Sequence, residues 1–227
     1  MKKILLLILL VYSSINAQVL YESVPSSKFN EPRNVKIQLP RNYEANEDKY
    51  YPVILVLDGD YLFEPVAGSA DYYSYWEDMP QAIIVGVMQP DRMEDTVYDD
   101  ANFLPTGQGA DFFEFLGMEL LPWLNKQYRL APFNVVVGHD ATAGFANYYL
   151  MKNPPLFNAY ISLSPDLAPQ MNERLTTILK QTEQQIFYYQ ATGTEDIPSL
   201  REETLALHQA LSGIENEKFH YYFDDFQ

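Results

Sequence analysis

The segment FNVVVGHDATAG, residues 133–144, has the pattern of a buried strand that runs through a tight turn into a helix. Its spacing matches the G-x-S-x-G turn, in which the central serine is presented as a nucleophile. Here Asp140 holds the central position, and Thr142 stands where the second glycine is usual. A carboxylate at such a turn could attack a substrate carbon and form an ester with it.

Asp140 has a second interpretation, in which its carboxylate caps the helix that begins near Ala141. The first amides of a helix lack partners inside the helix, and the helix dipole attracts negative charge. Thr142 is β-branched and suits the sharp turn of a nucleophile poorly. We therefore expect the capping role for Asp140.

Two other segments carry side chains suited to chemistry or binding. In ATGTED, Glu195 and Asp196 follow a glycine in an expected loop, where either could orient a histidine or simply face solvent. The segment DYYSYWED holds four aromatic residues, which could cover the sheet or form the rim of a binding surface. These are Tyr72, Tyr73, Tyr75 and Trp76.

The elements that must position these residues alternate along the chain. Strand-like runs occur at 34–39, 53–57, 82–88, 134–137, 159–163, 185–190 and 219–223, and the clearest helical patterns at 109–127, 141–152 and 199–211. Several strands are apolar throughout, as in parallel sheets covered on both faces. The pattern predicts one α/β domain, with a largely parallel sheet flanked by helices on both faces. Ligands of such folds bind in the loops at the carboxyl ends of the strands.

Together these segments resemble the esterase family of α/β-hydrolases that includes esterase D and the enterobactin-type siderophore esterases. The likeness runs from about Val24 to the last residue. It rests on segments quoted in chain order: YYPVILVLDGDYLF, AIIVGVMQPDRMEDT, GADFFEFLGMELLPWLNKQYR, VVVGHDATAGFANYYLMKNPPLFNAYISLSP and ATGTED.

The resemblance implies a role for each matching position. Asp140 replaces the nucleophilic serine, and Glu195 or Asp196 takes the acid position. The oxyanion donors would be backbone amides near Gly59 and Asp60 and the amide of Ala141. Arg92 and Asp95 would belong to a structural loop near the cleft.

The catalytic histidine of the family would follow the strand at 219–223. The chain ends at Gln227, before that loop, and holds only His139, His208 and His220. None of the three occupies that position, and we expect structural or surface roles for them. We also expect the C-terminal part of the domain to be truncated, without the terminal histidine loop and helix.

The N-terminal segment, the net charge and the composition indicate where the protein acts and which partners are excluded. The first seventeen residues, MKKILLLILLVYSSINA, have the basic start, apolar run and small final residue of a signal peptide, which leaves one domain at 18–227. Removal of Lys2 and Lys3 would take the formal net charge from −16 to −18, which argues against nucleic acid as a partner. We expect no cofactor and no metal, since the acidic loops lack known ligand spacing. The mature chain should also have no membrane span.

The sequence therefore predicts an exported, periplasmic or secreted, esterase-like domain without a competent catalytic triad. Such a domain would act as a binding or scaffolding module in the cell envelope, with a protein partner or a small-molecule ligand in the residual cleft. The alternative is an active hydrolase of carboxylic esters or related substrates. It would use Asp140 or a repurposed pocket, with a histidine beyond this chain.

Overall fold

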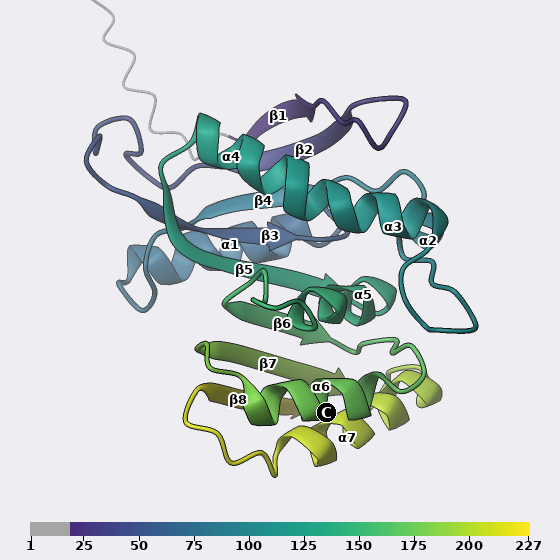
Figure 1. The fold of residues 1–227 in the computed structure, drawn as a ribbon. Helices are drawn as coiled ribbons and strands as arrows, with labels where there is room; N and C mark the ends of the chain where they lie inside the picture. Colours follow the sequence, from purple (N-terminus) through teal and green to yellow (C-terminus); the bar gives the residue numbers. More distant parts are fainter. Residues whose placement is uncertain (1–18) are drawn as a thin grey trace, which may run out of the picture.

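The computed structural model of the protein describes residues 19–227, so the predicted signal peptide lies outside the described residues. Eight strands form one sheet in the order β1-β2-β4-β3-β5-β6-β7-β8 (Figure 1). They are β1 Val19–Val24, β2 Arg33–Gln38, β3 Tyr51–Val56, β4 Ile83–Val87, β5 Leu130–His139, β6 Ala159–Leu163, β7 Ile186–Gly193 and β8 Phe219–Phe226. Strands β1 and β2 pair antiparallel, and the strands from β4 to β8 in the sheet order pair parallel.

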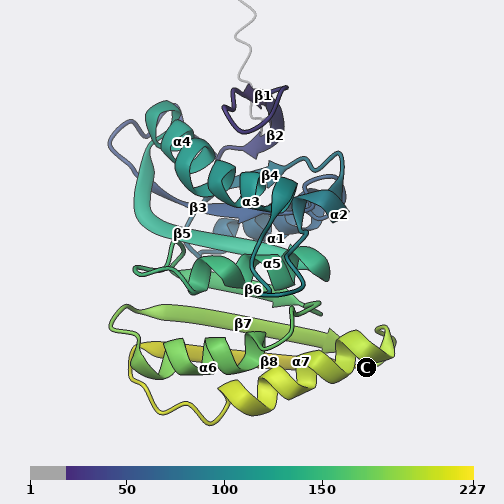
Figure 2. The ribbon, with the colours of Figure 1, turned by 45° about the vertical axis from the view of Figure 1, so that its right-hand side comes forward.

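Helices cover both faces of this sheet. They are α1 Phe63–Tyr75, α2 Arg92–Asp95, α3 Gly107–Glu114, the π-helix η1 Phe115–Leu120, α4 Leu121–Gln127, α5 Ala141–Leu150, α6 Met171–Gln181 and α7 Pro198–Leu211. The run from α3 to α4 lies on one face together with α5, α6 and α7, while α1 lies on the other (Figures 1 and 2). The predicted α/β architecture is thereby confirmed.

Alternating strand residues supply the two cores. In β3, Val53 and Leu55 pack in the larger core with the helices from α3 to α7, whereas Ile54 and Val56 pack against α1. Successive strand side chains point to opposite faces, so a strand buried on both sides must be apolar throughout. This is why these strands read as continuous hydrophobic runs. None of the helices among the described residues is long and apolar enough to cross a bilayer.

The sequence pattern located most elements within a few residues but missed four of them. The expected helix at 109–127 is a continuous helical run with a π-helical middle, and the strand at 134–137 extends to Leu130–His139. The missed elements are β1, α1, α2 and α6. Helix α1 was hidden because its buried residues are only Phe63, Ala67 and Ala70, and two alanines give a weak hydrophobic pattern.

Candidate active site

The turn between β5 and α5, called the elbow below, has a strained backbone. Asp140 lies at φ 57° and ψ −124°, a region that residues other than glycine rarely adopt. Its amide donates to Leu163 O at 2.9 Å, which ties the turn to the end of β6. A Cβ on Gly138 would lie 2.7 Å from the backbone of Thr142, so glycine is required for the close approach.

The capping role expected for Asp140 is wrong. Asp140 occupies the N-cap position of α5, but its side chain makes no hydrogen bond to the helix. The positive φ turns the carboxylate away from the first amides. Its Oδ2 instead accepts a hydrogen bond from Nη1 of Arg92 at 3.1 Å. The carboxylate at this turn is therefore paired with a guanidinium.

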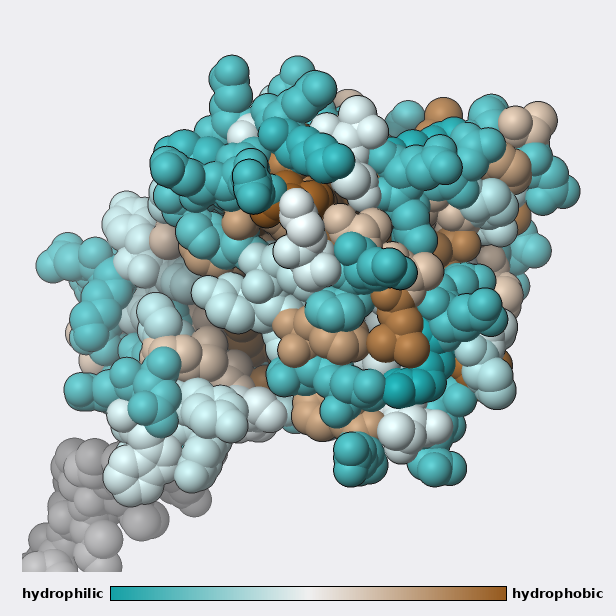
Figure 3. Space-filling view, turned by 90° about the horizontal axis from the view of Figure 1, so that it is seen from below, coloured by the Kyte–Doolittle hydropathy of each residue, from teal (hydrophilic) through white to brown (hydrophobic). Residues whose placement is uncertain are grey.

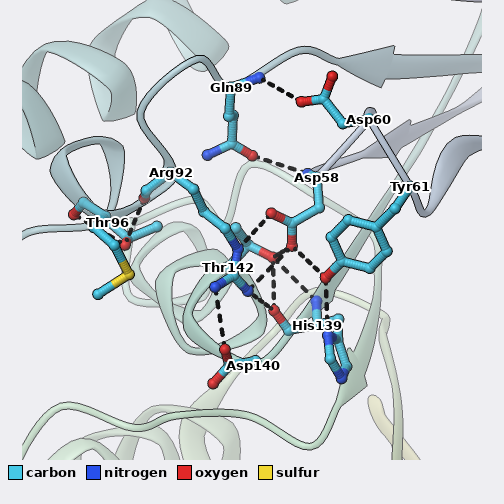
Figure 4. Close-up of polar contacts among 10 residues, drawn as sticks. Asp58, Asp60, Tyr61, Gln89, Arg92, Thr96, His139, Asp140 and Thr142 are labelled. Carbon is cyan, nitrogen blue, oxygen red and sulfur yellow. Dashed lines mark hydrogen bonds and ion pairs between the residues drawn. The ribbon is translucent and has the colours of Figure 1, made fainter.

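Arg92 connects this carboxylate to a second, buried one (Figure 4). Its Nε donates to Oδ1 of Asp58 at 2.6 Å, and its Nη2 donates to the carbonyl of His139 at 2.7 Å. The Asp58 side chain is 1% exposed, against 31% for Asp140. Burial alone would lower the pKa of Arg92, but the hydrogen bonds and charges of Asp58 and Asp140 raise it overall. The guanidinium is thus held charged between two aspartates.

Thr142 contributes to this network instead of disturbing the turn. Its side chain is fully buried, and its hydroxyl donates to Oδ2 of Asp58 at 2.6 Å. The Thr142 hydroxyl oxygen also accepts a hydrogen bond from the amide of His139 at 3.0 Å. The expectation that a β-branched residue fits poorly here is therefore wrong, because the hydroxyl has two partners that a glycine would lack.

Sequence reasoning missed three members of this network: Asp58, Tyr61 and Gln89. The Asp58 amide donates to Oε1 of Gln89 at 2.8 Å, and the Tyr61 hydroxyl donates to Oδ2 of Asp58 at 3.1 Å. Burial, and then the charge of Asp58, raise the pKa of Tyr61 to about 12. Position at the carboxyl ends of β3 and β4 was the available signal, but it does not say which side chains meet.

Arg92 and Asp95, the first and last residues of α2 in the segment after β4, have different partners. Arg92 points to the elbow, whereas the buried carboxylate of Asp95 faces away from it and pairs with Arg33 at 2.7 Å. Burial raises the pKa of Asp95, and Arg33 opposes that rise. Arg92 thus belongs to the candidate site, and Asp95 anchors the loop to β2.

Only one of the three histidines lies at the elbow. His139 Nδ1 shares a 2.8 Å hydrogen bond with the Tyr61 hydroxyl. His208 on α7 stacks on Phe223, and His220 on β8 stacks on Phe187. Strand β8 is the sheet edge, three positions from β5. Neither of these two histidines reaches the elbow.

His208 instead lines a separate cavity of about 470 Å³ between α7 and β8, together with Leu211 and Phe223. This side of the molecule is drawn at the lower edge of Figure 1 and faces the viewer in Figure 3. There, hydrophobic atoms show between mostly hydrophilic side chains.

The two acid candidates differ in their surroundings. Asp196 Oδ2 accepts hydrogen bonds from the hydroxyls of Ser164 at 2.5 Å and Thr192 at 2.7 Å and from the amide of Gly193 at 2.8 Å. Burial alone would raise the pKa of Asp196, but these hydrogen bonds and the charge of His139 lower it overall. Glu195 is exposed. The structure thus places Asp196 inward, with its Oδ2 occupied by Ser164 and by Thr192 and Gly193 at the end of β7.

The backbone amides predicted as oxyanion donors differ in whether they already have a hydrogen-bond partner. The Gly59 amide donates to Val87 O at 2.9 Å, so it is not free to bind a ligand, and this expectation is corrected. The amides of Asp60 and Ala141 have no hydrogen-bond partner within residues 19–227. Ala141 is the first residue of α5, where amides lack partners inside the helix.

The aromatic cluster of α1 lies apart from the elbow. Its four side chains are 50–61% exposed and do not cover the sheet, since α1 packs through its other face. Helix α1 runs back along the sheet from the loop after β3, so its last turn lies away from the carboxyl ends of the strands (Figure 1). The binding role of Tyr72, Tyr73, Tyr75 and Trp76 stays a prediction.

Comparison with known proteins shows which family this chain belongs to. The chain is similar to an uncharacterised protein from Capnocytophaga ochracea, with 31% identity and a TM-score of 0.85 over 92% of this chain and 58% of that one. An IroE-like serine hydrolase from Shewanella oneidensis has 24% identity and a TM-score of 0.80 over 92% and 74%. The enterobactin esterase from Shigella flexneri has 19% identity and a TM-score of 0.69 over 92% and 54%. These last two likenesses show the fold alone.

The chain thus spans less than two thirds of the length of the Capnocytophaga protein. No curated protein matches it. The family described as "Putative esterase" matches residues 26–217, which is most of the chain. The protein therefore belongs to this esterase family of α/β-hydrolase-like proteins.

Proposed function

We propose that this chain is an exported, esterase-like domain without a competent catalytic triad, which acts by binding a ligand or a partner in the cell envelope. In this proposal Asp140 stands where family members carry the nucleophilic serine. The signal-like start of the sequence supports export to the periplasm or beyond. The strongly negative charge suits a protein that remains in solution.

One observation carries the proposal: Arg92 links Asp140 to the buried Asp58. An aspartate nucleophile must offer a free oxygen lone pair to the substrate, and the ion pair with a guanidinium lowers the reactivity of that oxygen. Hydrolysis of the resulting ester would then need a base to activate water. His139 is engaged by Tyr61, and the inward acid Asp196 has no histidine bound to it among the described residues.

An assay of ester hydrolysis tests the proposal directly. Purified wild type, Asp140→Ala and Asp48→Asn would be incubated with p-nitrophenyl acetate and butyrate, with an unrelated acidic protein as the blank. Asp48 is exposed in a distant loop and gives the same change in net charge. We expect all three chains to match the blank. Turnover that is lost in Asp140→Ala and kept in Asp48→Asn would overturn the proposal.

The rival function is a hydrolase in which Asp140 itself attacks the substrate. The strained φ of 57° at Asp140 favours it, because strain of this kind is concentrated at functional sites. Attack of a carboxylate oxygen on an alkyl carbon would expel the leaving group and leave an alkyl ester on Asp140. Intact-mass measurement after incubation with alkyl halides, which would leave an alkyl ester on Asp140 and release halide, separates the two functions. We expect no adduct that depends on Asp140.

A further inference from the structure

A cavity of about 320 Å³ lies directly beside the elbow, between the loop after α2 and the first turns of α5. Ala141 and Gly144 of α5 line one side of it. The aromatic residues Tyr98, Phe145 and Tyr148 line it as well. This volume is at the small end of the range for ligand sites, so it suits a compact group better than a long chain.

Two acidic residues line the same cavity, Asp100 and Asp166, and both are exposed to solvent. Neither carboxylate has a hydrogen bond or ion pair to any side chain or backbone group that the structure describes, whereas Arg92 is already held by Asp58 and Asp140. The Asp166 amide donates to Asp140 O at 3.1 Å, which fixes this residue beside the elbow. The cavity therefore combines aromatic side chains with two carboxylates that have no direct hydrogen-bond or ion-pair partner among the described residues.

The titration behaviour of the lining agrees with this charge distribution. Burial, and then the charges of Asp166 and Asp100, raise the pKa of Tyr98. Partial burial, and then the charge of Asp140, raise the pKa of Asp166, and the charge of Arg92 opposes that rise. The charges of the neighbouring carboxylates contribute to both shifts, and this part of the shifts disfavours further negative charge here. A positive charge would be attracted by the same groups.

The side chains that line the cavity determine whether a metal ion or an organic cation fits it better. No group of three or more potential ligand side chains converges closely enough for a metal ion in the described part of the chain. An organic cation needs no such convergence, because it gains from aromatic faces as well as from carboxylates at longer range. We propose that this cavity binds a compact alkylammonium group between Tyr98, Phe145, Tyr148 and the carboxylates of Asp100 and Asp166. This inference rests on the proposed binding function and names the chemistry of its ligand.

Calorimetric titration with four probes tests the inference. The probes are choline, n-butylammonium, the neutral isostere of choline in which carbon replaces nitrogen, and calcium. We expect saturable binding of one ammonium ion per chain, and binding of the neutral isostere weaker by about tenfold or more. Preference for choline would indicate a free quaternary ammonium ligand, and preference for n-butylammonium a lysine-like amine, both within the proposal.

Variants that each remove one negative charge, inside or outside the cavity, test whether the ammonium ion binds in this cavity. Asp166→Asn should weaken ammonium binding by roughly five- to tenfold, while Asp48→Asn leaves it unchanged. Asp100→Asn, in an exposed turn, serves as the second cavity variant if Asp166→Asn fails to fold. Absence of ammonium binding, equal binding of the neutral isostere, binding of calcium alone, or an unchanged affinity in the cavity variant would each overturn the inference.

Failure of this inference is distinguishable from failure of the proposed function. The ester assay depends on Asp140, whereas the titration reads the affinity of the adjacent cavity. Turnover that requires Asp140 would overturn the noncatalytic role even if ammonium bound. Loss of ammonium binding would leave the noncatalytic role standing.

Discussion

Nη1 of Arg92 lies 3.1 Å from Oδ2 of Asp140, while Nε of the same side chain lies 2.6 Å from Oδ1 of Asp58. The guanidinium thus bridges a nearly buried aspartate and a partly exposed one. The contact of Arg92 with Asp58 is the shorter of the two. Asp58 also accepts hydrogen bonds from the hydroxyls of Thr142 and Tyr61, whereas Asp140 does not. The two aspartates should therefore differ in their contribution to stability.

The substitutions Asp58→Asn and Asp140→Asn should reveal this difference in the free energy of unfolding. Asp58→Asn removes the charge that compensates a half-buried guanidinium, and we expect a loss of about 2–4 kcal/mol in the free energy of unfolding. Asp140→Asn removes a partly exposed ion pair and should cost at most about 1 kcal/mol. Denaturant unfolding at neutral pH measures both. An equal or reversed order would mean that Arg92 is held mainly by Asp140.

Serine at position 140 should not restore an esterase. Asp140→Ser would regain the hydroxyl, but no described histidine is placed to accept its proton, and Asp196 is bound by Ser164 and by the end of β7. We expect hydrolysis of p-nitrophenyl acetate no faster than with Asp140→Ala. A clear rate gain in the serine variant alone would show that a base does reach the elbow.

Two helical glycines should respond in opposite directions to alanine. A Cβ on Gly144 would lie 1.7 Å from Asp166 O, so Gly144→Ala must displace backbone and should cost about 3 kcal/mol or more. Gly68 in α1 has nothing within 4 Å of the same atom. Gly68→Ala should therefore stabilise the protein by about 0.5–1 kcal/mol through helix propensity. Thermal or denaturant unfolding compares the two, and a tolerated Gly144→Ala would contradict the close approach.

Asp196 should make stability depend on pH below neutrality. Its folded-state pKa is lowered, so its stabilisation is present above the unfolded value of about 3.9 and is lost as pH falls through the folded value. We expect Asp196→Asn to be less stable than wild type by about 1–3 kcal/mol at pH 7, from the weakened hydrogen bonds. The difference should shrink as pH falls below about 4.

Glu195→Gln is the matched control for Asp196, since it changes an exposed neighbour of the same charge. Its stability should stay within about 0.5 kcal/mol of wild type at each pH. Unfolding curves at several pH values would measure both variants. A pH dependence that follows Glu195 instead would reverse the assignment of the inward acid.

The sequence by itself determined the fold class and the position of the elbow. Apolar runs such as 53–57 and 82–88, separated by helical patterns, specify a parallel sheet because strands buried on both faces tolerate few polar residues. Gly138 and Asp140 mark the turn for a local reason, since the strand, the tight turn and the helix follow one another directly. Such local signals need no knowledge of distant contacts.

Only the tertiary structure decided what the elbow carboxylate contacts. Asp58, Arg92 and Asp140 are separated by 34 and 48 residues along the chain, and they meet because β3, β4 and β5 end at the same edge of one sheet. Cap formation by Asp140 was a sound local expectation, yet the positive φ and the nearby guanidinium overrode it. Thr142 likewise found partners that no pattern reveals, because a buried hydroxyl is satisfied by whichever polar groups the fold brings to it.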